Sequence, residues 1–73
     1  MATLKIISDS DCHVFIDMEL KCDIKANTLC KLSLNKGSYI IDCVHINQID
    51  RVSLDYNIDE ENTEYLLRVN LNN

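Results

Sequence analysis

The sequence predicts an all-β fold, a small antiparallel β-sandwich of about seven short strands. Apolar residues recur at a spacing of two far more often than at three and four, which is the strand period. The alternating runs are short and are separated by clusters of turn residues. A chain of 73 residues also has room for only one small core, so we expect a single domain covering residues 1–73.

The first half of the chain contains four candidate strands. Residues 4–7 open the fold, and residues 13–18 alternate apolar and mixed positions in the same way. A short piece follows at residues 20–25, and residues 30–34 alternate again. Each run therefore has one face for the core and one mixed face.

The second half adds three strands. Residues 38–46 are apolar on both sides, so this strand is predicted to be central and buried on both faces. Residues 51–58 and 64–71 alternate cleanly. The acidic opening of residues 59–68 could begin a helix, but the run is short and its later part has the strand period, so we favour a strand.

The gaps between strands contain residues that reverse a chain. Gly37, after Asn35 and Lys36, is expected at positive φ, closing a type I turn. The cluster at residues 8–11 and the pair at residues 47–48 offer side-chain oxygens to backbone N–H groups. Asp17 is predicted at the first position of a turn, where its carboxylate would accept a backbone N–H two residues on.

Three of these segments together resemble the PEGA-type domains of bacterial proteins, which are small β-sandwiches often attached to larger chains. The similar elements are residues 4–7, the stretch Val14-Phe15-Ile16-Asp17, and the stretch Leu34-Asn35-Lys36-Gly37-Ser38-Tyr39-Ile40, which resembles that family's hairpin. They span residues 4–46. Met18 stands where the family usually has glycine, and Asp9-Ser10-Asp11-Cys12 replaces its Pro-x-Gly-Ala turn. The resemblance implies a fold, and a module that can lead a longer chain, but no catalytic residues.

The composition and charge of the chain limit which compartment and which classes of partner are expected. The net charge is −5, and its excess of acids lies in residues 41–73. Single lysines scattered among acids do not favour nucleic-acid binding. No apolar run approaches the roughly 18 residues of a membrane span, and no export signal is visible, so we expect a cytoplasmic protein without membrane contacts. Four cysteines could pair in three ways or remain reduced and buried.

The candidates for chemistry are few. Cys43 and His45 lie two apart on one strand face and could contact a metal ion, but no Cys-x-x-Cys pair supports a zinc site. Residues 59–62 offer oxygen ligands without the glycine of a calcium loop. Cys12 and His13 are adjacent, so on a strand they point to opposite faces. We therefore expect no catalytic residues, no metal ligands and no cofactor.

The favoured function is that of a non-catalytic interaction or spacer module of a bacterial protein, acting through exposed sheet edges or faces. Residues 4–8 and 64–71 are the expected edge strands, through which a protein partner or a second copy could bind. The alternative is an acidic protein that mimics nucleic acid, which requires the seven acids between Asp42 and Glu64 to line one face. A metal-binding domain ranks third. Oligomeric state and small-molecule ligand are left open.

Overall fold

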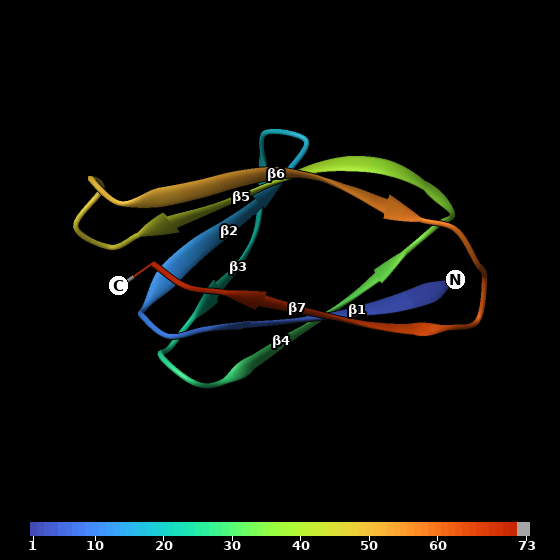
Figure 1. Cartoon of the computed structure of the whole chain (residues 1–73), viewed down its shortest axis with the longest axis horizontal. Helices are drawn as coiled ribbons and strands as arrows, with labels where there is room; N and C mark the ends of the chain where they lie inside the picture. Colours follow the sequence, from blue (N-terminus) through green and yellow to red (C-terminus); the bar gives the residue numbers. More distant parts are fainter. Residues whose placement is uncertain (72–73) are drawn as a thin grey trace.

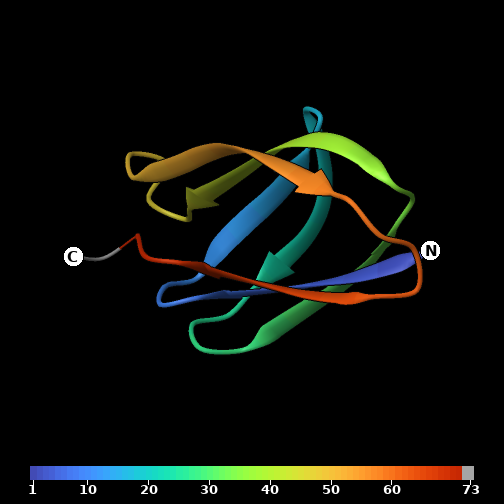
Figure 2. The ribbon, with the colours of Figure 1, turned by 45° about the vertical axis from the view of Figure 1, so that its right-hand side comes forward.

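The computed structural model describes residues 1–71 as a two-layer β-sandwich (Figures 1 and 2). The described chain forms seven strands, in the order β1 (Ala2–Ser8), β2 (Cys12–Ile16), β3 (Glu19–Ile24), β4 (Leu29–Leu34), β5 (Gly37–His45), β6 (Arg51–Ile58) and β7 (Glu64–Val69). The all-β prediction is therefore confirmed. Residues 64–69 are a strand, as we favoured over a helix.

One layer is a three-stranded sheet in the order β4-β1-β7. β1 lies at its centre, so the prediction that residues 4–8 form an edge strand is wrong. β7 lies at the edge, as predicted. β1 pairs with β4 antiparallel and with β7 parallel, and the parallel pair is the one departure from the antiparallel arrangement that the sequence predicts.

The second layer is a four-stranded sheet in the order β3-β2-β5-β6. β5 lies between β2 and β6, which confirms the predicted central strand. The link from β4 to β5 passes from one sheet to the other, so residues 34–40 do not form a hairpin. Gly37 begins β5 with a φ of 153°, so its φ is positive as expected, but it starts a strand after the crossing between sheets and does not close a type I turn.

The core lies between the two sheets and is built from the inward positions of each alternating strand. The fully buried large side chains include Leu4 and Ile6 from β1, Val14 from β2 and Ile41 from β5. β1 and β2 alternate strictly between buried and half-buried residues, as the sequence pattern predicts. These central strands therefore hold the two layers together through apolar burial.

The two flanks of the sandwich are closed differently. On one flank, a disulfide joins Cys22 of β3 to Cys30 of β4 and so links the two sheets covalently. On the other, the rings of Tyr56 and Tyr65 meet edge to face with centroids 6.2 Å apart. The Tyr65 hydroxyl also accepts the backbone N–H groups of Asp59 and Glu60, which fixes the loop between β6 and β7.

Residues 1–71 contain no helix long and apolar enough to cross a bilayer.

The predicted turn clusters do hold backbone groups. Within residues 8–11, the Ser8 hydroxyl accepts the Ser10 N–H, and Asp11 Oδ1 accepts the N–H of Ala26 at 2.7 Å. Asn47 Oδ1 accepts the N–H groups of Ile49 and Asp50. Both turn predictions are confirmed.

Candidate binding surface on the four-stranded sheet

The outer face of the four-stranded sheet is apolar but uncovered. The sequence predicts that β5 is buried on both faces, and this prediction is wrong for the outer one: Ile40 is 49% exposed and Val44 is only half-buried. No other described segment packs over them, because the second layer covers only the inner face. Opposite β5, Phe15 of β2 is half-buried and its cross-strand neighbour Leu20 is 53% exposed.

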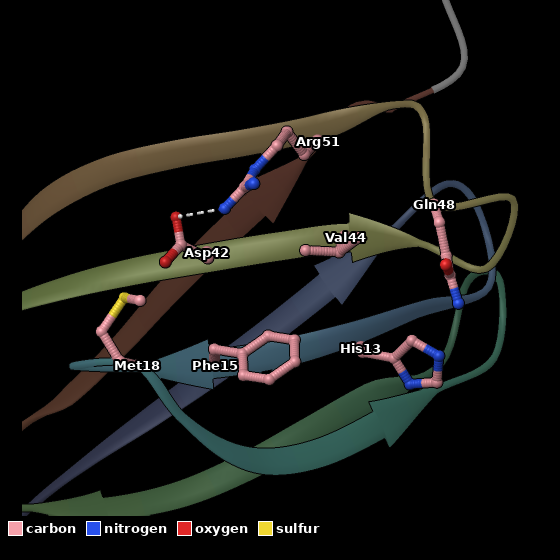
Figure 3. Close-up of a pocket in the computed structure, with 7 residues that line it drawn as sticks. All are labelled: His13, Phe15, Met18, Asp42, Val44, Gln48 and Arg51. Carbon is pink, nitrogen blue, oxygen red and sulfur yellow. Dashed lines mark ion pairs between the residues drawn. The ribbon is translucent and has the colours of Figure 1, made fainter.

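An open hollow of about 360 Å³ lies on this face (Figure 3). We call it the Phe15 hollow, and its lining residues are His13, Phe15, Met18, Asp42, Val44, Gln48 and Arg51. Figure 3 shows Met18, Phe15 and His13 in a row beside Asp42 and Val44 of β5. Arg51 of β6 closes the hollow on the far side of β5, with Gln48 near its His13 end. Phe15 and Val44 form the apolar part of the hollow, and the charged side chains of Asp42 and Arg51 lie beside them.

Met18 occupies an unfavourable backbone conformation at the rim. Asp17 and Met18 are the two residues between β2 and β3, with φ values of 51° and 71°. A two-residue hairpin of type I′ requires positive φ at both positions and strongly prefers glycine at the second. Met18 is nevertheless present, and it is 82% exposed. A large apolar side chain is thus held outward at a site where glycine would fold more easily.

Asp17 does hold this turn, but in another way than the sequence suggests. It occupies the first central position of the two-residue loop, and its carboxylate accepts the N–H of Ile40 at 2.9 Å rather than one two residues on. The Asp17 N–H in turn donates to the carbonyl of Ile40 at 2.8 Å. The paired bonds fasten the β2–β3 turn to β5 and so fix Met18 beside the hollow.

Asp42 is a buried carboxylate in the middle of this face. It is 5% exposed and lies opposite Phe15 on one side and Ser53 on the other. Its ion-pair partner is the Arg51 guanidinium, 3.5 Å away and itself 61% exposed. Removing a carboxylate from water is costly unless it is paired, so Arg51 is held over the hollow by this charge.

A second polar pair lies at the other end of the face. The Nδ1 of His13 contacts the carboxylate of Asp23 across β2 and β3. Asp23 is well exposed, and the His13 side chain is 37% exposed. The pair therefore forms part of the rim and not a buried relay.

The structure separates the residues that the sequence offered for chemistry. Cys12 points into the core while His13 points outward, as predicted. Cys43 is fully buried, and the Nδ1 of His45 accepts the N–H of Asn47, so the two are engaged separately. Within residues 1–71, no three His, Cys, Asp or Glu side chains form a group that could hold a metal ion. At residues 59–62, Glu61 instead pairs with the N-terminal amine at 3.1 Å.

The two free thiols face each other inside the core. Cys12 and Cys43 are both buried and contact one another through their side chains. Burial raises the pKa of Cys43 to about 12 and also raises that of Cys12. A thiolate is the reactive form of cysteine, so these groups are structural and inert at neutral pH.

The outer face of the three-stranded sheet has a second open hollow, of about 430 Å³. We call it the Leu66 hollow, and it is lined by Lys5, Ile7, Leu29, Glu64, Tyr65, Leu66 and Arg68. Leu29 and Leu66 are about half exposed. Lys5 donates to the Glu64 carboxylate at 2.9 Å, and this contact lowers the pKa of Glu64. Both outer faces therefore combine an apolar centre with charged side chains.

Sequence reasoning did not single out Phe15, Met18 and Asp42 as parts of one candidate binding surface. The apolar outer side of residues 38–46 was the available signal, because it could mean either a covering layer or an uncovered binding face. Met18 at a chain reversal without glycine was a second signal. The chain matches no family model, no curated protein and no solved structure.

Proposed function

We propose that this protein is a non-catalytic interaction module that binds a protein partner through the outer face of its four-stranded sheet. The observation that carries the proposal is Met18, an apolar side chain that is 82% exposed at positive φ beside an apolar hollow. A strained residue that is not needed for packing persists where it serves another purpose. Met18 lies next to Phe15, Ile40 and Val44, and a group of uncovered apolar side chains fits the binding of a partner.

A face suits this role better than an edge. An added strand would bind mainly through its backbone, and it would leave the apolar side chains of Phe15, Ile40 and Val44 uncovered. A partner seated on the face would cover these three side chains together with Met18. Arg51 and His13, at opposite sides of the Phe15 hollow, would supply polar contacts at the rim.

The alternative of a nucleic-acid mimic has less support. It requires the seven acids of the second half to share one face. Asp42 and Asp55 lie on the outer face of the four-stranded sheet, whereas Glu64 lies on that of the three-stranded sheet and Asp50 lies in a turn. The carboxylates are thus divided between surfaces and do not form a continuous track.

Two expectations accompany the proposal. The resemblance to PEGA-type domains of bacterial proteins points to a module that works within or beside a larger assembly. We place the protein in the cytoplasm, where the Cys22–Cys30 disulfide would be reduced. Counting free thiols in protein taken directly from cells tests the location: four free thiols support the cytoplasm and two argue for an oxidising compartment.

Photocrosslinking in the cells that make the protein tests the binding role. A benzophenone amino acid at position 18 should crosslink to one defined protein chain. The same group at position 49 is the matched control, because Ile49 is also apolar and is 80% exposed but lies in the β5–β6 turn. Equal crosslinking from both positions, or none from position 18, would contradict the proposal.

A further inference from the structure

We propose that the partner is a second copy of this chain, which seats the outer face of its three-stranded sheet on the outer face of the four-stranded sheet. This inference rests on the proposed function and identifies the partner of that same surface. The charges, the apolar residues and the areas of the two outer faces support it.

The outer face of the four-stranded sheet is acidic. Asp23, Asp42 and Asp55 are outward carboxylates on β3, β5 and β6, because each lies opposite an outward residue of its neighbouring strand. Among the described residues of this face, Arg51 is paired with Asp42, and His13 contacts Asp23. We call this surface the acidic face, and its centre is the apolar Phe15 hollow.

The outer face of the three-stranded sheet is basic. Its outward residues include Lys5 of β1, Lys31 of β4 and Arg68 of β7, against the single carboxylate of Glu64. Lys5 and Lys31 lie directly opposite each other across the strand pair. Like charges at opposed positions destabilise an isolated sheet, so this pair is better satisfied by additional carboxylates. We call this surface the basic face, and the Leu66 hollow lies at its centre.

The two faces complement each other in charge and in apolar content. An acidic face brought onto a basic face would place Asp23 and Asp55 near lysines and Arg68, with the apolar centres in contact. Met18 protrudes from the rim of the acidic face, so it is the apolar side chain best placed to enter the Leu66 hollow. Two acidic faces, or two basic faces, would repel each other.

The area of contact between two copies limits how tightly they associate. The molecule measures 34 × 21 × 19 Å, so one outer face offers on the order of 600–700 Å², slightly below the ~800 Å² per partner of a standard interface. We therefore expect reversible association that depends on concentration. Because the two surfaces differ, the contact is heterologous, and each added copy leaves one acidic and one basic face free. The product is a row of copies and not a closed pair.

Sedimentation velocity of the purified chain with blocked variants tests this arrangement. Leu66→Glu places an acid on the basic face, and Ile40→Lys places a cation on the acidic face, so each change removes an apolar contact and repels the face of the second copy. Both side chains are about half exposed, so the fold should tolerate the changes. Wild type should form species larger than a dimer as concentration rises, and less so in high salt. Each variant alone should sediment as a monomer, and an equal mixture should give a 1:1 dimer and nothing larger.

A matched control and a second variant keep the result interpretable. Ile49→Glu adds the same charge at an exposed apolar residue outside the Phe15 hollow, and it should assemble as wild type does. If Leu66→Glu fails to fold, Arg68→Glu blocks the same face at an exposed position. Wild type that stays monomeric at all concentrations, or a mixture of blocked variants that does not pair, overturns the inference.

The crosslink from position 18 separates this inference from the proposed function. Attachment to β1, β4 or β7 of a second copy supports both. A crosslink to a different protein overturns self-association but leaves the binding role intact. No specific crosslink, together with a monomeric chain, overturns both.

Discussion

Ile40 and Ile41 are consecutive residues of β5 whose side chains lie in opposite environments. Ile41 is fully buried between the sheets, whereas Ile40 is 49% exposed on the outer face. Around Ile41 the packing is complete, with Val14 and Cys43 also inaccessible to solvent. Around Ile40, the neighbouring Phe15 and Val44 have no covering layer in the described chain. The same strand thus packs in the core with one side and exposes apolar side chains to solvent with the other.

The largest expected effect comes from truncating each isoleucine to alanine. Ile41→Ala should lower the free energy of unfolding by about 2–5 kcal/mol, because it leaves a cavity in a packed core. Ile40→Ala should cost less than about 1 kcal/mol, since its side chain already contacts water. Chemical denaturation of both variants measures the difference. Similar losses at the two positions would show that the outer face also stabilises the fold.

Removing the Cys22–Cys30 disulfide measures how much the covalent link between the two sheets adds to the free energy of unfolding. The disulfide closes a short loop between β3 and β4, with a sequence separation of 8. Removing it by the double substitution Cys22→Ala and Cys30→Ala should cost about 2–3 kcal/mol, mainly because the unfolded chain gains freedom. Denaturation with and without a reducing agent gives the same comparison in the wild type. An unchanged midpoint would mean that the flank is held by packing alone.

Alkaline pH should lower the free energy of unfolding through the two buried thiols of the core. Burial raises the pKa of Cys43 from 9.0 to about 12 and also raises that of Cys12, so the folded state keeps protons that the unfolded state releases. Stability from this source is complete below pH 9 and falls as pH rises toward 12. The slope should reach at most about 1.4 kcal/mol per pH unit for each thiol. The variant Cys12→Ala, Cys43→Ala should show a shallower loss in the same denaturation series.

The smallest expected effect is that of replacing Met18, which should increase stability and decrease partner binding. Met18→Gly should raise the free energy of unfolding by about 0.5–1 kcal/mol, because glycine adopts the positive φ of the turn without strain. The same change should weaken partner binding, since it removes the protruding side chain. Thermal denaturation and sedimentation of one preparation check both. A variant that is less stable, or that binds as wild type does, would contradict the role given to Met18.

Most of the fold could be predicted from the sequence, because its signals are local. The two-residue period of β1 and β2 and the turn chemistry of Asn47 identify strands and reversals without tertiary information. The pairing of strands could not be predicted in this way. β1 was expected at an edge, yet it lies at the centre because β7, distant in sequence, pairs with it in parallel.

The candidate site could be predicted only in part. Apolar residues on both sides of β5 gave the correct central position, but they could not show whether a further layer covers the outer side. That depends on how many strands each sheet receives, which is a property of the whole chain. The burial of Asp42 likewise requires Phe15 and Arg51, from two other strands, to meet around it.

The parallel pairing of β1 and β7 has a mechanical consequence. Because the two strands run in the same direction, β1 begins at one end of the sandwich and β7 ends near the other (Figure 1). Tension applied between those ends would slide β1 against β7 and load the hydrogen bonds of that ladder together, in shear. A module joined in line with others through its two ends would therefore resist stretching better than one whose terminal strands could be peeled apart bond by bond.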